Sequence, residues 1–193
     1  MSILTIDGPR QPAAATTEQL VIFVHGYGAD GNDLIGLAPY FAQALPNAAF
    51  VAPNGPQRCE MSPMGYQWFP INQFDPTSRL TGVQDAAPIL DQFIDQELAR
   101  HGLGEENLLL VGFSQGTMMS LHVGLRRARQ VAGILGYSGL LAGPELLADE
   151  AVVKPPILLV HGDVDEMLPV QNLHDAVEAL GAAGLNVEWH VSP

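Results

Sequence analysis

The chain has 193 residues, of which 47% are hydrophobic, and a formal net charge of −13 from 8 basic and 21 acidic residues. This length supports one domain with a substantial core, and so acidic a surface argues against nucleic acid or an anionic membrane as a partner. No apolar stretch approaches the ~20 residues of a membrane span, and no secretory signal precedes the first strand. With Cys59 as its single cysteine, the chain is expected to be cytoplasmic, without stable membrane insertion.

Six apolar runs predict strands, at residues 20–24, 48–52, 107–111, 131–135, 156–160 and 187–191. Apolar residues three and four apart predict helices between them, at residues 33–45, 83–100, 117–125 and 168–180. Pro88 implies that the second of these helices starts later or is kinked. Apolar strands that alternate with helices indicate an α/β fold, with a mostly parallel sheet covered on both faces. Residues 1–193 are expected to form a single domain.

The first strand runs into His25-Gly26-Tyr27-Gly28-Ala29-Asp30-Gly31, which has two interpretations. Gly-x-Gly-x-x-Gly between a strand and a helix is typical of a nucleotide-dependent oxidoreductase, which also needs an acidic residue at the end of the next strand. No Asp or Glu occurs between Asp33 and Glu60, which weakens this interpretation. The alternative is an oxyanion-hole loop, in which the backbone N–H of Tyr27 stabilises a developing negative charge and His25 is structural.

Residues 53–82 interrupt the alternation of strands and helices. This stretch is rich in Pro, Gly, Asn and Gln, and it carries the large apolar residues Met61, Met64, Trp68, Phe69 and Phe74. Long loops inside compact domains are usually functional or mobile. The aromatic and methionine side chains would either line a pocket for an acyl chain or attach the loop to the core, and a loop that flanks an active site commonly does both.

The third strand leads directly into Gly112-Phe113-Ser114-Gln115-Gly116. Gly-x-Ser-x-Gly between a buried strand and a helix predicts a nucleophile elbow, a strained turn that holds the Ser114 hydroxyl out at the carboxyl end of the sheet. The glycines let strand and helix approach closely, and the backbone N–H of Gln115 would complete the oxyanion hole. The pentapeptide alone is weak evidence, so its context carries the prediction. Three arginines near the helix end suit the helix dipole: Arg126, Arg127 and Arg129.

The fifth strand is followed by His161-Gly162-Asp163-Val164-Asp165-Glu166-Met167. In the chain order Ser, acid, His, either Asp163 or Asp165 could orient a catalytic base, because both follow a strand at the edge where the elbow presents Ser114. The alternative is an acidic turn with a helix cap.

These segments together resemble one family of α/β-hydrolases, the phospholipase/carboxylesterase family, which includes acyl-protein thioesterases and lysophospholipases. The resemblance rests on FVHGYGADGNDL, FVAPNGP, QWFP, LLLVGFSQGTMMSL and LLVHGDVDEMLP. It implies a serine hydrolase that acts on carboxylic esters, and often on thioesters or lysophospholipids, without a metal or organic cofactor. By position in the motifs, Ser114 matches the family's nucleophile and Asp165 matches its triad acid. Tyr27 and Gln115 match the two oxyanion-hole residues. Trp68 and Met167 match residues that line the family's acyl pocket.

The catalytic histidine of that family has no match in this chain. The family places it in the loop after the last strand, and here the sequence stops at Pro193. His174 lies within a predicted helix, which is the wrong place for the base. His190 lies within the last strand and is the less favoured alternative to a histidine beyond the chain. The helix that ends the family fold is absent too, so one sheet face would expose an apolar patch. We therefore expect the domain to be C-terminally incomplete, with the triad histidine beyond Pro193.

The expected function is that of a serine carboxylesterase that hydrolyses a small-molecule acyl ester through a Ser-His-Asp triad and an acyl-enzyme. The alternative is a catalytically inactive α/β-hydrolase that acts as a binding protein, for which the absent histidine is the only support. An exposed sheet edge or apolar loop could support a homodimer.

Overall fold

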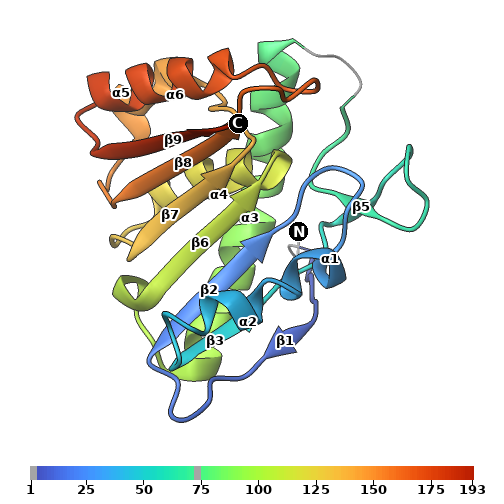
Figure 1. The fold of residues 1–193 in the computed structure, drawn as a ribbon, viewed down its shortest axis with the longest axis vertical. Helices are drawn as coiled ribbons and strands as arrows, with labels where there is room; N and C mark the ends of the chain where they lie inside the picture. Colours follow the sequence, from blue (N-terminus) through green and yellow to red (C-terminus); the bar gives the residue numbers. More distant parts are fainter. Residues whose placement is uncertain (1–3, 72–74) are drawn as a thin grey trace.

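The structure is a computed structural model, and it describes residues 4–71 and 75–193. Its centre is a seven-stranded sheet in the order β1-β3-β2-β6-β7-β8-β9 (Figure 1). β1 is antiparallel to β3, and the other neighbouring pairs are parallel. The strands are β1 (Arg10–Gln11), β2 (Gln19–Val24), β3 (Ala48–Val51), β6 (Leu108–Phe113), β7 (Gly133–Tyr137), β8 (Ile157–Gly162) and β9 (Val187–Ser192). All six predicted strands are confirmed. The additional strand β1 was not predicted, because two residues are too few to show the alternation of apolar and polar side chains.

Helices lie on both faces of the sheet, as predicted. One core lies between the sheet and α3 (Pro76–His101), α4 (Gln115–Arg126) and α6 (Gln171–Ala182). A smaller core lies on the other face, under α1 (Gly31–Ile35) and α2 (Ala38–Phe41). The remaining elements are short: α5 (Leu147–Glu150), two 3₁₀ turns (Glu105–Asn107 and Pro144–Leu146) and a hairpin of β4 (Gln57–Arg58) and β5 (Tyr66–Gln67).

Two predicted helices have different bounds in the structure. The helix expected at 33–45 is divided into α1 and α2, because Pro39 has no N–H to donate and its ring would clash with the carbonyl of Ile35. The helix expected to start at or after Val83 begins instead at Pro76, where the Asp75 side chain caps it by accepting from the N–H of Ser78 at 3.0 Å. The helix continues through Pro88, so a later start is wrong.

The early start of α3 shortens the loop that the sequence predicts at 53–82. The first two turns of α3 take up its last residues, and the hairpin β4–β5 occupies part of the remainder. Trp68 and Phe69 are buried, whereas Met61 and Met64 are exposed. Phe74 lies outside the described residues. Buried and exposed apolar side chains therefore divide this segment into an anchored part and a projecting part.

Ion pairs account for Arg127 better than the predicted helix dipole does. Its guanidinium is buried and contacts the carboxylates of Asp91 and Asp95, both at 2.6 Å, and that of Glu105 at 3.2 Å. The first two belong to α3, so the end of α4 is fixed to the neighbouring helix. A cluster of this kind depends on every partner, because a charge left buried without its counter-ion is costly.

The buried ring of His122 on α4 makes the stability of the fold depend on pH. Burial, with the nearby positive charge of Arg126, lowers the pKa of His122 to about 4. An unfolded histidine binds a proton near its ordinary pKa of about 6.5, so acid favours the unfolded chain. We expect the free energy of unfolding to fall by about 1 to 2 kcal/mol between pH 7 and pH 5 through this residue.

Chemical denaturation of His122→Gln at pH 7 and pH 5 checks this expectation. The variant should lose less stability over that range than the parent protein. The matched control is His190→Gln, because His190 is exposed on β9. Equal pH slopes for the parent and His122→Gln would contradict the assignment.

Candidate active site

The turn between β6 and α4 has the backbone of a nucleophile elbow. Ser114 lies between the two elements with φ 54° and ψ −114°, a positive φ that is unusual outside glycine and costs of order 1 to 3 kcal/mol. Its N–H donates to the carbonyl of Tyr137 on β7 at 2.8 Å. The predicted strand, strained turn and helix are therefore confirmed at this position.

The two glycines of the elbow are required by close packing. A Cβ on Gly112 would overlap the backbone of Gly116, and a Cβ on Gly116 would overlap the carbonyl of Val24 at the end of β2. These neighbours are backbone atoms, which cannot move aside as a flexible side chain can. The elbow helix consequently lies directly against the end of β2.

The loop after β2 lies beside the serine. A Cβ built on Gly26 would be 3.3 Å from the Cβ of Ser114, which brings the following residue, Tyr27, to the same site. Gly28 turns the loop at φ 79°, and its N–H donates to the backbone carbonyl of Tyr66 in the hairpin at 2.9 Å. Gln115 is the first residue of α4, so its N–H has no partner within the helix. The structure thus places Gln115 and the residue before Tyr27 next to Ser114, and the role of the two N–H groups in an oxyanion hole stays a prediction.

His25 is a structural residue, as expected. Its Nε2 accepts the N–H of Gly55 at 2.8 Å, so the proton is on Nδ1, which donates to the carbonyl of Gly26 at 2.7 Å. Burial lowers the pKa of this imidazole and keeps it neutral. The ring therefore connects the end of β2 to the segment that follows β3.

Gln115 has a second role, which the sequence does not indicate. Its side chain is fully buried, accepts from the N–H of Trp68 at 2.8 Å and donates to the carbonyl of Phe69 at 2.9 Å. The Trp68 indole in turn donates to the carbonyl of His25 at 3.1 Å. Trp68 is itself only 1% exposed, so the described contacts are those of an anchor, and its place in an acyl-pocket wall stays a prediction.

Replacing Gln115 by methionine should lower the free energy of unfolding by about 2 to 4 kcal/mol, because two buried backbone groups would lose their partners. Thermal or urea denaturation measures the loss. In the matched variant Gln115→Glu, one oxygen can still accept from Trp68 but a second oxygen faces the carbonyl of Phe69. Gln115→Glu should therefore be no more stable than Gln115→Met. Parental stability in either variant would contradict the role of the Gln115 side chain as an anchor for Trp68 and Phe69.

Asp165 lies in the loop after β8 with its carboxylate held by backbone groups. Oδ1 accepts from the N–H groups of Met167 and Leu168, both at 2.9 Å. The Leu168 hydrogen bond is the main cause that lowers the pKa of this carboxyl, with further help from Met167 and from His161. Asp165 is therefore ionised at neutral pH, as the orienting acid of a triad must be. Asp163 is exposed, so the structure favours Asp165 of the two.

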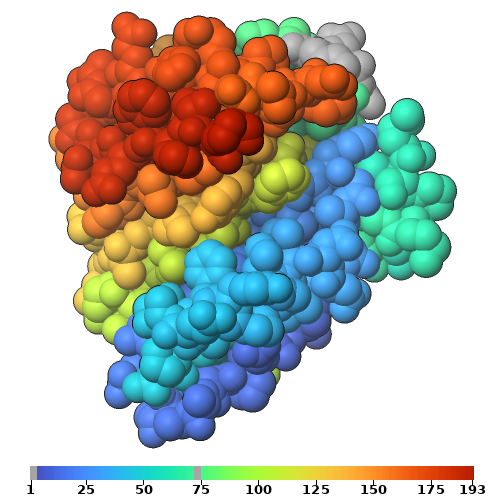
Figure 2. Space-filling model, viewed as in Figure 1, coloured from blue at the N-terminus to red at the C-terminus, as the bar shows by residue number. Residues whose placement is uncertain are grey.

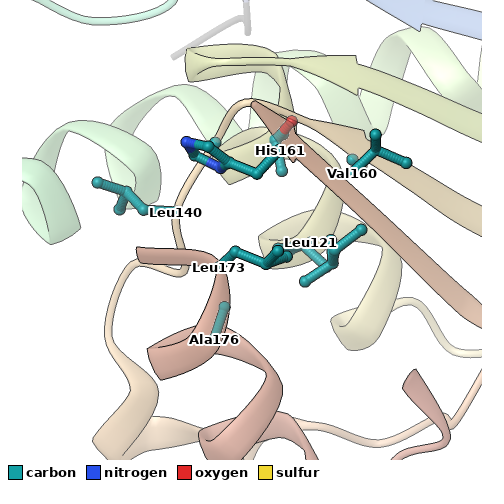
Figure 3. Close-up of a pocket in the computed structure, with 10 residues that line it drawn as sticks. Leu121, Leu140, Val160, His161, Leu173 and Ala176 are labelled. Atoms are coloured by element: carbon teal, nitrogen blue, oxygen red, sulfur yellow. The ribbon is translucent and has the colours of Figure 1, made fainter. Parts of the chain in front are cut away.

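His161 supports the Asp165 loop from inside the protein. The ring is 1% exposed, and its Nε2 lies 2.7 Å from the carbonyl of Leu168 and 3.5 Å from Asp165 Oδ2. In Figure 3 it points toward Leu140, whereas Val160 points to the other side of β8. The adjoining cavity holds about 10 Å³, which is room for a single water molecule. This side of the site is therefore tightly packed, and it supports the Asp165 loop without offering space for a substrate.

A larger groove of about 410 Å³ opens on the opposite face of the sheet. Figure 2 shows the hollow between α2, in cyan, and the orange and red strands β8 and β9. Phe113, Tyr137 and Ser138 line it where β6 and β7 end, and Ser192 lines it at the end of β9. No helix of the described chain covers β7 to β9 on this face (Figure 1). The predicted open apolar face is thus present.

The two histidines that follow Asp165 are both away from the elbow. His174 is on α6, where its ring packs edge-on against Trp189 at a centroid distance of 5.4 Å. His190 is on β9, opposite Val160 of β8. Strands lie about 4.8 Å apart, so β9 is about 14 Å from β6 across the sheet. The other wall residue that the family resemblance implies, Met167, is 83% exposed beside Asp165; its contact with substrate stays a prediction.

Comparison with known proteins identifies the family. The model of the phospholipase/carboxylesterase family matches residues 4–193. The chain belongs to this family. The enzyme is 31% identical over 201 residues to acyl-protein thioesterase 1 of Gibberella zeae, covering 94% of this chain and 84% of the relative. The family acts on ester bonds, and this member is accordingly a hydrolase of that class.

Solved structures agree with this assignment. The enzyme is 41% identical to esterase PE8, with a TM-score of 0.94 and coverage of 98% of this chain and 89% of that one. It is 26% identical to SOBER1 of Arabidopsis thaliana, with a TM-score of 0.75 and coverage of 91% and 88%. The fold is therefore the α/β-hydrolase fold that the sequence predicts. Among the helices of the described chain, none has both the length and the apolar character to cross a membrane.

Proposed function

We propose that the enzyme is a serine carboxylesterase that works through a Ser-His-Asp triad and an acyl-enzyme. The observation that carries this proposal is the strained backbone of Ser114 at the end of β6, at the same edge of the sheet as the ionised Asp165 after β8. Similarity to esterase PE8 and to acyl-protein thioesterase 1 supports it and lends no support to a protein that only binds.

In the proposed reaction, the Ser114 oxygen attacks the acyl carbonyl carbon while a histidine takes the hydroxyl proton. The carbonyl π electrons move to the oxygen, and the backbone N–H groups of Tyr27 and Gln115 stabilise that oxyanion. The intermediate collapses to an acyl-serine as the leaving alcohol or thiol receives the proton from the histidine. Water then repeats the sequence and releases the carboxylic acid, while Asp165 holds the imidazole in the required tautomer.

We propose that the histidine follows Pro193. The N–H of Asp163 donates to the carbonyl of Ser192 at 2.9 Å, so β9 ends beside the Asp165 loop. The chain beyond this point starts within reach of that carboxylate. Residues that follow Pro193 would also cover the open apolar face, which fits a C-terminally incomplete domain.

The proposed substrate is a small-molecule acyl ester or thioester. Trp68 and Met167 are proposed to contact the acyl group, with residues 53–82 as the flanking segment. Exposed Met61 and Met64 on the hairpin connection, and exposed Met167 beside Asp165, supply flexible apolar surface for it. The resemblance to acyl-protein thioesterase 1 supports a thioester as an alternative substrate, with a thiol as its leaving group.

Intact mass spectrometry with a fluorophosphonate, which phosphonylates activated serines, tests the proposal. The protein that carries the residues after Pro193 should gain one adduct on Ser114. The same protein with Ser114→Ala should gain none. An unlabelled parent, or an adduct that persists in Ser114→Ala, would overturn the proposed function.

A further inference from the structure

Thr117 is a buried polar residue in the first turn of α4, and it is 2% exposed. In a helix, a threonine hydroxyl commonly binds the carbonyl of a helical residue three or four positions earlier. The Thr117 hydroxyl instead lies 2.9 Å from the carbonyl of Gly112 on β6 and 3.0 Å from the carbonyl of Tyr137 on β7. A hydroxyl has one proton, which the two carbonyls share. The side chain therefore binds two strands of the sheet and not its own helix.

The hydrogen bonds of Thr117 form a ring around the backbone of Ser114. The Ser114 N–H donates at 2.8 Å to the same Tyr137 carbonyl that the Thr117 hydroxyl binds, and the Ser114 carbonyl accepts from the Thr117 N–H at 2.9 Å. That carbonyl shares one planar peptide group with the N–H of Gln115, so holding the first directs the second. A strained backbone such as that of Ser114, with φ 54° and ψ −114°, persists only where surrounding contacts hold it.

Two glycines leave the space that the Thr117 side chain fills. A Cβ on Gly136 of β7 would be 2.6 Å from the γ-methyl of Thr117, and a Cβ on Gly139 would overlap the Cβ of Thr117. Neither glycine has a positive φ, so close packing is the reason that a side chain is excluded there. The strand β7 and the turn after it therefore enclose this threonine, and its hydroxyl is held at the two carbonyls.

We infer that Thr117 is a positioning residue for the nucleophile, whose hydroxyl joins β6 to β7 at the elbow and so holds the strained backbone that presents the Ser114 oxygen. The inference rests on the proposed Ser-His-Asp mechanism. Thr117 touches neither the substrate nor the transferred proton. It acts through Ser114, and through the Gln115 N–H that follows from the same backbone. Losing the hydroxyl should therefore slow every reaction of the Ser114 oxygen.

Thr117→Ser and Thr117→Ala are a matched pair, because both lose the γ-methyl and they differ only by the hydroxyl. They are made in the protein that carries the residues after Pro193 and assayed with a p-nitrophenyl ester. Thr117→Ser should keep kcat within about twofold of the parent. Thr117→Ala should lower kcat by about tenfold, the effect of one hydrogen bond, with KM within about twofold. Its rate of fluorophosphonate labelling should fall by the same factor, because labelling uses the same oxygen.

Val123→Ala separates positioning from a general loss of stability. Val123 is buried on the same helix and is 4% exposed, so this variant should lower the melting temperature and keep kcat within about twofold of the parent. Equal kcat in Thr117→Ser and Thr117→Ala would overturn the inference, as would a tenfold loss of kcat in Val123→Ala. Labelling of the parent keeps the two proposals distinct: a labelled parent with equally active Thr117 variants refutes this inference alone, and an unlabelled parent refutes the proposed function.

Discussion

Replacing Ser114 by alanine should lower kcat/KM for a p-nitrophenyl ester by at least about 10⁴-fold, because the acyl-enzyme cannot form without the nucleophile. The elbow presents the hydroxyl from a backbone that the Tyr137 carbonyl and the close approach of Gly112 and Gly116 hold in place. Alanine keeps the Cβ and loses only the oxygen, so the fold should remain. Steady-state kinetics, with circular dichroism to verify folding, measure the effect.

Ser120, a serine of the helix α4 that follows Ser114, supplies the control for this variant. Ser120 is fully buried, and its hydroxyl has no hydrogen-bond partner among the described residues. Ser120→Ala should therefore keep activity within about twofold of the parent, since no catalytic step is assigned to it. Substantial esterase activity in a folded Ser114→Ala protein would show that the nucleophile lies elsewhere.

Asp165→Asn should lower kcat by about 10⁴-fold, the loss expected when the acid that sets the histidine tautomer becomes an amide. The amide oxygen can still accept from the N–H groups of Met167 and Leu168, whose hydrogen bonds of 2.9 Å to Asp165 Oδ1 hold the loop. The loop should therefore keep its shape. The substitution removes the negative charge of the carboxylate and replaces one accepting oxygen with a donating NH₂ group. Measurement of kcat at saturating ester, together with the melting temperature, distinguishes lost chemistry from lost structure.

Asp163→Asn is the matched variant, since both aspartates satisfy the order of residues along the chain. The Asp163 side chain is exposed, and its described contact to Ser192 is made by the backbone N–H. We expect parental kcat in this variant. If Asp163→Asn lost activity and Asp165→Asn kept it, the assignment of the acid would be reversed.

The sheet could be predicted from the sequence because five of its six longer strands are largely apolar runs and the sixth, β9, alternates apolar and polar residues. The elbow could be predicted too, since the steric need for Gly112 and Gly116 is local to the turn. The strand β1 could not, because two residues show no period and its pairing with Val51 and Phe50 depends on a distant segment. The break after Ile35 was within reach of the sequence, since Pro39 marks it.

The candidate site was less accessible to sequence reasoning where side chains act across long separations. Gln115 was predicted for its backbone N–H, yet its side chain binds Trp68 and Phe69, 47 and 46 positions away. No local pattern encodes such a contact. The strained turn at Ser138 after β7 gave no signal either, because its φ of 44° is visible only in the folded chain. Residues that bind backbone or support other residues are therefore found from geometry, after the fold is known.

Three consecutive neighbours in the sheet, β6, β7 and β8, are followed by the Ser114 elbow, the turn at Ser138 and the Asp165 loop. The spacing of these groups is therefore set by the hydrogen-bonded ladder of the sheet and not by a hinged loop or a second domain. We therefore expect nucleophile and acid to stay together for as long as the core stays intact. On heating, its activity should be lost together with the sheet, in one cooperative transition, and not at a lower temperature of its own.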